Sequence, residues 1–468
     1  MGVFYTAGES KVRPGVYQRY SNAGGAPVAG ALNGTCAMVL NASWGPVNKV
    51  TTHESSNTIE QVYGSCESAK IAKLLFNGGA TKVYIVRAAG GNGSPGTAGT
   101  AEMSFVTVNS KYPGSRSIKV KVALNLADSS IKNIYVLDGT TQLEKFEYEA
   151  DETDEREAFT KAVADSEYIT VVKGSEAGVI AEQEVILTGT DPTPSIDEYE
   201  DAFYALESFD YNVICMDKAL NTYNNVLAAY IDEVYRSGKL IMGVVGEITQ
   251  GDNKVDFETR CTRSKAFNDE KIIYMGSGWI DSENNYVDGA SAVAYAAGLI
   301  AGTPSTQSIV HNVVSGAVDT IEKLTNNQHE IAINSGMLTL SLNPEGQAWF
   351  DSGVNTLITP DANQDMGWKK IKRTKVRFEV LNRVDKTIAP LVGKVNCDKD
   401  GIANIIQIGT GVLSTMCAEK KIKDTYSMYV DPELGYSADS AWFIIAVDDI
   451  DSLEKIYLHY QFRYSDMA

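Results

Sequence analysis

The sequence predicts a multidomain α/β protein with three parts: a central domain of alternating strands and helices, a β-rich domain inserted into it, and an α+β C-terminal domain. Three observations lead to this prediction. The length of 468 residues exceeds the size at which single hydrophobic cores stop growing. Strand and helix patterns alternate on both sides of a stretch that contains mainly strand patterns. The last hundred residues combine two amphipathic helix patterns with three strand patterns.

The N-terminal residues, 1–20, are predicted to form an extended arm that ends in a short strand. Residues 1–12 are mostly small and polar, and their few apolar residues show no period. The stretch Arg13–Tyr20 is β-prone, and Pro14 near its start suits a strand at the edge of a sheet. A glycine-rich linker, Ser21–Pro27, leads into the first domain.

Residues 21–91 and 193–343 are predicted to form the central α/β domain. Buried strand patterns alternate with amphipathic helix patterns, which implies a sheet covered by helices on both faces. The predicted strands are Thr35–Asn41, Lys82–Arg87, Asn212–Met216, Leu240–Val245, Lys271–Met275 and Met337–Leu342, and the predicted helices are Ser68–Phe76, Tyr199–Leu206, Tyr223–Tyr235, Phe257–Phe267, Ser291–Gly302 and Asn327–Ile333.

Residues 92–192 are predicted to form the inserted β-rich domain. Its strand patterns include Ile118–Leu126 and Ile134–Leu137, and a highly acidic helix pattern covers Asp151–Ala164. A glycine-rich stretch precedes this domain, and the proline-containing stretch Asp191–Pro194 follows it. Both compositions are typical of linkers, so we expect the domain to be peripheral.

The glycine-rich linker contains the pattern GxGxxG at Gly91, Gly93 and Gly96, directly after a predicted strand. A dinucleotide site also needs a helix to begin there, because the first turn of that helix binds the pyrophosphate. The residues that follow, Thr97–Val108, are β-prone instead. We therefore favour a linker over a nucleotide site.

Residues 344–468 are predicted to form the C-terminal domain. Its first strand pattern is Gly353–Ile358. A basic segment, Lys369–Lys375, runs into a helix pattern that Pro390 ends, and a second helix pattern begins at Gly401. Three strand patterns complete the domain: Tyr426–Val430, Trp442–Val447 and Ile456–Arg463.

The last of these strand patterns has two distinct faces and needs a partner. One face consists of Ile456, Leu458, Tyr460 and Phe462, and the other of Tyr457, His459, Gln461 and Arg463. The unpaired backbone of such a strand must pair with its own sheet or with a sheet in another copy of the chain. Nothing in this segment indicates catalysis, and we interpret its chemistry as assembly.

The composition excludes several classes of protein. A net charge of −19 argues against a nucleic-acid-binding protein, because phosphate contacts need a positive surface. No apolar run reaches eighteen residues and no signal peptide is evident, so we expect no membrane insertion and synthesis in a cytoplasm. The six cysteines form no CxxC pair, and we interpret them as buried free thiols.

The charge is uneven along the chain. Between Met366 and Asp424, thirteen lysines and arginines stand against six acidic residues. Three of these lysines, Lys420, Lys421 and Lys423, cluster where the second helix pattern ends. A run of like charge is usually a solvated face, and the alternative is a surface that docks an acidic partner.

The residue types of enzyme and metal sites do not gather at any point in the sequence. The four histidines are scattered, and none has a cysteine or carboxylate at ligand spacing. Asp448, Asp449 and Asp451 lack the glycine and distal glutamate of an EF-hand, so we interpret them as a solvated turn. No P-loop, GxSxG or HExxH motif is present. We therefore predict a protein that is not an enzyme and has no cofactor.

The order of several motifs resembles contractile phage tail sheath proteins, a family that includes the sheaths of R-type bacteriocins. The motifs are Arg13-Pro14-Gly15-Val16-Tyr17, Phe76-Asn77-Gly78-Gly79 before the strand Val83–Arg87, Gly353-Val354-Asn355-Thr356-Leu357, and Gly393-Lys394-Val395-Asn396-Cys397 followed by Gly401-Ile402-Ala403-Asn404. The resemblance covers most of the chain and is weakest between residue 93 and about residue 190.

The resemblance implies a structural subunit that stacks as hexameric rings around an inner tail tube and contracts to drive the tube through a cell envelope. It implies contacts with other copies, the tube, the baseplate and a tail terminator, in a virion tail or bacteriocin particle. It implies that the N-terminal arm (Pro14, Gly15, Val16 and Tyr17) and the last strand pair with neighbouring subunits, and that Lys420, Lys421 and Lys423 face the tube. A Rossmann-like enzyme built on the central domain is the alternative.

Overall fold

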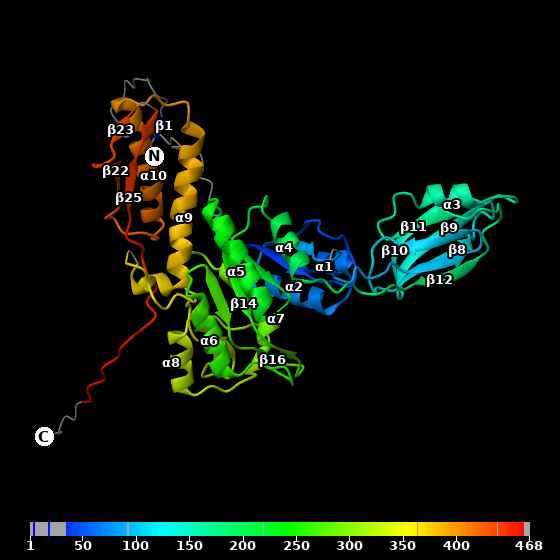
Figure 1. The fold of residues 1–468 in the computed structure, drawn as a ribbon, viewed down its shortest axis with the longest axis horizontal. Coiled ribbons are helices and arrows are strands. Elements are labelled where there is room, and N and C mark those ends of the chain that lie inside the picture. The colour runs from blue at the N-terminus through cyan, green and yellow to red at the C-terminus, as the bar shows by residue number, and fades with distance from the viewer. Residues whose placement is uncertain are drawn as a thin grey trace. The chain divides into compact units, whose positions relative to one another are not determined.

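The computed structural model describes residues 34–90, 93–218, 220–362, 364–437 and 439–462 (Figure 1). It also describes two short strands, β1 (Val3–Phe4) and β2 (Tyr17–Gln18), which pair in parallel. The chain divides into two compact units. The larger unit contains Leu32–Phe378, Glu419–Lys423 and the residues from Asp448 onward. The smaller unit contains the N-terminal strands, Glu379–Ala418 and Asp424–Val447.

A seven-stranded sheet forms the centre of the larger unit, in the order β19-β15-β14-β13-β3-β5-β4. All neighbouring strands are parallel except β4, which is antiparallel to β5. The strands are β3 (Thr35–Leu40), β4 (Thr51–His53), β5 (Lys82–Arg87), β13 (Val213–Met216), β14 (Met242–Gly246), β15 (Ile272–Met275) and β19 (Met337–Leu338). The predicted βα alternation is confirmed.

Helices cover both faces of this sheet. The evidence is that successive residues of a strand are buried in different hydrophobic clusters. Met38 packs in a cluster with α2 and α7, and its neighbour Val39 packs in a cluster with α4 and α5. The helices are α1 (Ser56–Tyr63), α2 (Glu67–Gly78), α4 (Ile196–Ala205), α5 (Asn221–Arg236), α6 (Phe257–Phe267), α7 (Gly289–Gly302) and α8 (Asn326–Asn334). A Cβ atom on Gly298 would lie 2.0 Å from the Leu75 carbonyl oxygen, so glycine permits the close packing of α7 on α2.

The inserted segment forms two antiparallel sheets and a short helix around its own core. The sheets have the orders β10-β9-β8-β12 and β11-β7-β6. The elements are β6 (Thr100–Met103), β7 (Val106–Ser110), β8 (Ile118–Leu124), β9 (Ile131–Asp138), β10 (Thr141–Glu149), α3 (Arg156–Ala162), β11 (Ile169–Lys173) and β12 (Gln183–Leu187). The two linkers pair through single bridges, Ser94 with Thr193 and Thr97 with Thr190.

Helix α3 is shorter than the sequence pattern predicts. The carboxylate of Asp151 accepts hydrogen bonds from the backbone N–H groups of Thr153 and Asp154. This local turn competes with helix formation, so the helix begins only at Arg156.

The predicted boundary at residue 344 differs from the division seen in the structure. Ala348, Phe350 and Val354 are buried in the cluster of the central sheet, and the larger unit extends to Phe378. The predicted strand Gly353–Ile358 is wrong, because only Val354 makes a bridge, to Lys370. Asn355 instead bonds the backbone locally: its side chain accepts from the N–H of Leu357 and donates to the Trp368 carbonyl.

Smaller sheets flank the central one. The strands β16 (Trp279–Asp281), β17 (Tyr286–Val287) and β18 (Ala317–Thr320) form one sheet, and β20 (Leu340–Leu342) pairs with β21 (Ala348–Phe350). A 3₁₀ turn, Met366–Lys369, leads into α9 (Ile371–Ile388), which continues past Phe378 into the smaller unit.

The smaller unit contains two helices and two short antiparallel sheets. A 3₁₀ turn, Ala389–Leu391, follows α9, and α10 spans Lys399–Ala418. The sheets pair β22 (Ser427–Val430) with β25 (Phe443–Ala446) and β23 (Tyr436–Ser437) with β24 (Ser440–Ala441).

Helix α10 is the one described helix that is long and apolar enough to cross a membrane by length and composition. Its buried residues include Ile402, Val412 and Leu413, and Gly409 lies against Met428 of β22. A core helix passes the same test of length and hydropathy, and the packing on β22 explains the apolar residues of α10.

Candidate assembly surfaces

Side chains of this chain fill the switch point of the central sheet, where an enzyme of this topology would bind its ligand. The strand order reverses between β3 and β13, and ligands of such sheets bind beyond the strand ends at this point. Here the Asp217 carboxylate accepts hydrogen bonds from the Asn41 backbone N–H, the Ser68 hydroxyl and the Tyr199 hydroxyl. The Asn41 side chain donates to the carbonyl of Pro192 in the linker of the inserted domain. The root of that domain therefore lies at the switch point.

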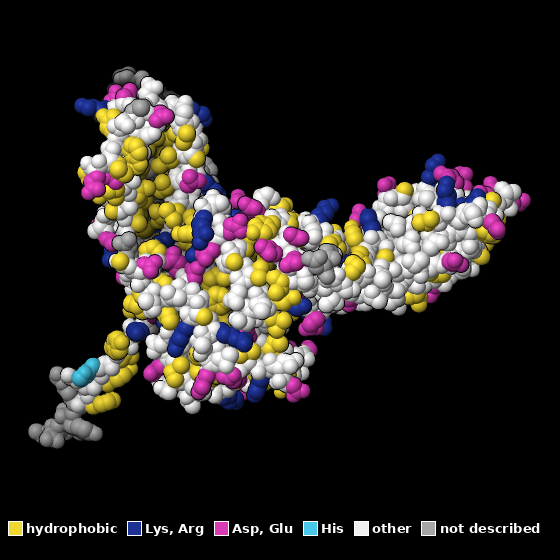
Figure 2. Space-filling model, in the orientation of Figure 1, with side chains coloured by type: hydrophobic (Ala, Val, Ile, Leu, Met, Phe, Trp, Pro, Cys, Tyr) yellow, Lys and Arg dark blue, Asp and Glu magenta, His cyan; other side chains and the backbone are white. Residues whose placement is uncertain are grey.

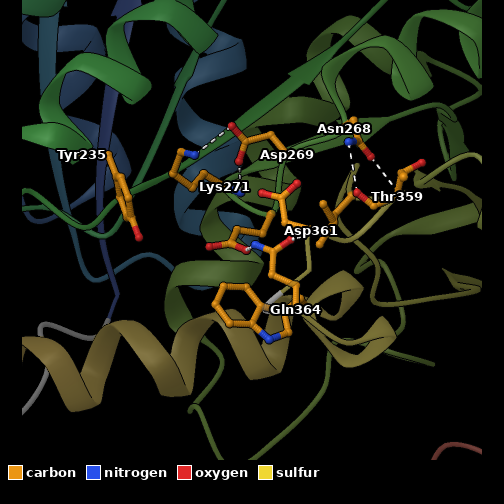
Figure 3. Close-up of a pocket in the computed structure, with 10 residues that line it drawn as sticks. Tyr235, Asn268, Asp269, Lys271, Thr359, Asp361 and Gln364 are labelled. Carbon is orange, nitrogen blue, oxygen red and sulfur yellow. Dashed lines mark hydrogen bonds and ion pairs between the residues drawn. The ribbon is translucent and has the colours of Figure 1, made fainter. Parts of the chain in front are cut away.

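A polar cavity of about 280 Å³ lies where the segment before α9 packs near the start of β15 (Figure 3). The Asn268 side-chain oxygen accepts from the backbone N–H of Thr359, and Gln364 donates to Glu270 at 3.1 Å. Lys271 pairs with Asp269 at 2.8 Å. Burial raises the pKa of the Glu270 carboxyl.

These lining residues bind mainly one another, and they join residues 357–368 to the sheet. In the described part of the chain, no cluster of three or more histidine, cysteine, aspartate or glutamate side chains could hold a metal ion. The interactions of the lining residues therefore indicate a packing role.

Aromatic rings line the junction between the central sheet and the inserted domain. Trp44 is buried against Tyr112 and Tyr168, with ring centroids 5.4 and 6.4 Å away. The Arg116 guanidinium lies over Tyr168 at 5.4 Å and forms an ion pair with Asp138 at 2.9 Å. Trp44 belongs to the core of the inserted domain although it precedes that domain by about fifty residues, a contact that the linear sequence does not reveal.

The last described residues form an apolar segment that is paired with no strand of the described chain. No secondary structure is present between residues 451 and 462. Both faces of the predicted strand are exposed: Ile456 is 70% exposed, Tyr457 88%, Leu458 69% and Phe462 88%. Figure 2 shows apolar side chains gathered along this segment. Of the two partners considered for this strand, a strand of its own sheet does not occur among the described residues.

The sheet of β22 and β25 in the smaller unit is incomplete. It has only two strands, and each has one edge without a described partner strand. Phe443, Ile444 and Ile445 are only half-buried, and Tyr429 and Trp442 are exposed. A two-stranded ribbon is marginally stable by itself, so further strands would stabilise it.

Most cations at the start of the predicted basic segment are used inside the chain. Lys370, Lys372 and Arg373 bind the segment Asp449–Glu454, and Lys375 donates to the carbonyls of Ile300 and Thr303. The excess charge seen in the sequence is therefore only partly a surface property.

The three lysines predicted to face a tube do not lie in equivalent environments. Lys421 is buried, with 9% of its surface exposed, and its ammonium pairs with Glu419 at 2.7 Å. Lys420 and Lys423 are exposed. Lys420 has a positive φ of 59°, and this left-handed residue turns the chain after α10, so neighbouring lysines point differently. The prediction of a three-lysine surface patch is corrected to two lysines.

The N-terminal residues of the prediction fall largely outside the described part of the chain. Pro14, Gly15 and Val16 lie outside it, and Tyr17 lies in β2. His459 and Gln461 lie in the exposed C-terminal segment with Tyr460.

One family model matches part of the chain, and single proteins match nearly its whole length. Residues 194–356 match the family model described as phage tail sheath protein central domain. Among curated proteins, "Phage-like element PBSX protein XkdK" of Bacillus subtilis is 22% identical, covering 98% of this chain and 99% of its own. "Uncharacterized protein YqbK" of the same organism is also 22% identical, covering 99% of this chain and all of its own.

Solved structures share the fold over nearly the whole chain. The sheath tail protein of Desulfitobacterium hafniense has a TM-score of 0.73 at 18% identity and covers 93% of this chain and 100% of its own. The sheath tail protein Lin1278 of Listeria innocua has a TM-score of 0.69 at 18% identity, with coverages of 90% and 96%. The contracted helical sheath of the anti-feeding prophage has a TM-score of 0.54 at 11% identity, with coverages of 97% and 99%.

Proposed function

We infer that this chain is a contractile tail sheath protein, a structural subunit of the phage tail sheath family. The observation that carries this conclusion is the match of residues 194–356 to the central domain of that family. The fold supports it, because sheath proteins share it across nine-tenths of the chain. The Rossmann-like enzyme has no support, since the switch point of the sheet is filled by the Asp217 network.

We propose that subunits are joined by β-augmentation. The exposed segment Lys455–Phe462 would be donated to the β22–β25 sheet of a neighbouring copy, and the N-terminal residues around Tyr17 would add a second strand. The donor has an apolar pattern without a partner in the described chain. The acceptor has edges that no described strand pairs with, and half-buried apolar side chains. Main-chain hydrogen bonds would supply affinity, and the alternating side chains would fix the register.

The further partners follow from the same proposal. Stacked hexameric rings would surround an inner tail tube, with the exposed Lys420 and Lys423 facing an acidic tube surface. A baseplate and a terminator would bind the two ends of the sheath, in a virion tail or a bacteriocin particle. One structural neighbour with a TM-score of 0.56 belongs to the anti-feeding prophage baseplate, which supports an association of this kind. Contraction would be a rigid-body rotation of subunits that stay linked by donated strands.

Electron microscopy of the purified chain tests this function. A sheath subunit forms long hollow cylinders in negative stain, and an enzyme forms discrete particles. The matched variant ends at Glu454 and lacks the exposed segment. We expect it to melt like the full chain and to form no cylinders. Discrete particles of the full-length chain, together with turnover of a small molecule, would contradict the proposal.

A further inference from the structure

The exposed C-terminal arm (residues 455–462) begins directly after a segment that is tightly bound to the larger unit. The side chains of Lys370, Lys372 and Arg373 hold this segment, which we call the arm root (Asp448–Glu454). Arg373 donates to both carboxylate oxygens of Asp449, from Nε at 2.6 Å and from Nη2 at 2.7 Å. Such a bidentate pair fixes orientation as well as distance.

Two lysines extend this contact along the arm root. The Lys370 ammonium pairs with Asp451 at 2.6 Å and with Glu454 at 2.9 Å. The Lys372 ammonium donates to the Ile450 carbonyl at 2.6 Å. The Ser308 hydroxyl also donates to Glu454, at 3.0 Å. Side chains therefore hold the arm root at four of its residues, Asp449, Ile450, Asp451 and Glu454.

Backbone hydrogen bonds complete the attachment. The Lys423 N–H donates to the Asp448 carbonyl at 2.7 Å, and the Ile450 N–H donates to the Lys421 carbonyl at 2.9 Å. A bridge joins Ile422 to Asp449 between them. This explains the acidic triplet of the sequence, Asp448, Asp449 and Asp451, as part of an attachment and corrects its interpretation as a solvated turn.

The side chains that anchor the arm root are more buried than the side chains of the arm. The side chains of Asp449 and Glu454 are 12% and 20% exposed, whereas Ile456 and Tyr457 are 70% and 88% exposed. A released chain of seven residues could extend by on the order of 25 Å. The attached root cannot extend in this way, so a force on the arm acts directly on the larger unit.

We propose that Lys370, Lys372 and Arg373 are positioning residues that anchor the root of the donated arm. Because the anchored root cannot extend, the movement of one subunit is transmitted directly through the arm to the next. The partner on the arm is a second copy of this chain, so the inference rests on the proposed function. The anchor itself is a property of one subunit. It can therefore be measured before any assembly takes place.

The experiment uses the unassembled full-length chain and hydrogen exchange of the Lys423 and Ile450 amides. Arg373→Asp places two carboxylates together, and we expect these amides to exchange at least tenfold faster. The double variant Arg373→Asp with Asp449→Arg restores opposite charges, and we expect exchange within about threefold of the wild-type rate. Lys386→Glu is the matched control, because it makes an equal charge reversal at an exposed position of α9 and should leave both amides unchanged.

Assembly is then followed by sedimentation of cylinders. We expect Arg373→Asp to yield at least fivefold fewer cylinders than the wild-type chain, and the double variant to recover most of them. Unchanged amide exchange in Arg373→Asp would overturn the anchor, as would fast exchange that the double variant does not restore. If a variant with a released root assembled fully, the proposal that the anchored root transmits subunit movement would be overturned. A wild-type chain that forms no cylinders would instead refute the proposed function, while the exchange result would still decide whether the root is anchored by these charges.

Discussion

Arg87 and Pro113 connect the central sheet to the inserted domain, because the Arg87 Nη2 atom donates to the Pro113 carbonyl at 2.8 Å. The Nη1 atom of the same guanidinium donates to the Gly45 carbonyl, also at 2.8 Å. Arg87 ends β5 and is fully buried, and this burial lowers the pKa of its guanidinium to about 10. The group still carries its charge at neutral pH and is bound mainly through carbonyl oxygens.

Replacing this arginine should loosen the junction. In Arg87→Lys the single ammonium cannot reach both carbonyls, and a buried acceptor is left without a donor. We expect the free energy of unfolding to fall by about 1–3 kcal/mol. Denaturant unfolding, with hydrogen exchange around residue 113, measures both effects. Arg236→Lys, at an exposed position in the last turn of α5, is the control and should change neither.

Removal of the inserted domain should leave a chain that still polymerises. Residues 94 and 193 are already paired, so a short Gly-Ser linker can replace residues 95–192 without strain. The core of the insertion is separate from both clusters of the central sheet, and Trp44 is the one described buried residue of that core that comes from outside the insertion. Trp44→Ser would prevent a newly exposed indole. Cylinders in negative stain confirm the prediction, and a folded variant that never assembles contradicts it.

The sequence predicted the central domain well because its signals are local. The strand Lys82–Arg87 and the helix Phe257–Phe267 have the predicted bounds. An apolar run determines the strand, and the helix lies between an Asp256 N-cap and the left-handed Asn268. Local side-chain hydrogen bonds explain two misses: Asp151 delays α3, and Asn355 prevents a strand.

The assembly surfaces were harder to predict, because they depend on distant partners. The bond between Arg373 and Asp449 joins residues 76 positions apart, so sequence spacing could not reveal it. The lysine cluster was visible in the sequence, but the burial of Lys421 was not. The alternation from Ile456 to Phe462 was visible, and its exposure in the single chain is the observation that only the structure supplies.

Stability should depend on pH through His53. The ring is buried, and its nitrogens lie 2.9 Å from the hydroxyls of Thr51 and Thr58. Burial lowers its pKa from 6.5 to about 4. Between about pH 6.5 and pH 4, His53 is therefore protonated in the unfolded chain but not in the folded chain. We expect the free energy of unfolding to fall by about 3 kcal/mol as the pH is lowered across this window.

Denaturant unfolding at pH 7 and pH 4.5 measures this loss, and His53→Gln separates it from other groups. The variant should lose less stability than the wild-type chain between the two pH values, because glutamine does not titrate. Equal losses in both chains would show that His53 does not control this window.

The exposed lysines should control binding to the tube. We expect Lys420→Glu with Lys423→Glu to weaken co-sedimentation with an acidic tube, and the wild-type contact to weaken as salt rises, because exposed charges act over about 8 Å at physiological salt. Lys394→Glu with Lys399→Glu is the matched control, since both residues are exposed and the charge change is equal. Equal binding by both double variants and the wild-type chain would make the lysines a solvated face.

The sharpest prediction concerns Leu458, in the middle of the exposed arm. Leu458→Pro removes one backbone donor and fixes φ, which interrupts a donated strand. The side chain is 69% exposed in the single chain, so the melting temperature of the unassembled subunit should stay near the wild-type value. Leu458→Val keeps the donor and an apolar, β-prone side chain, and it should still form cylinders. We expect no cylinders from the proline variant, because each lost ladder bond costs about 0.5–1.5 kcal/mol and the break divides the strand. A proline variant that assembles normally would rule out strand donation, whereas one that unfolds as a monomer would place the segment in its own sheet.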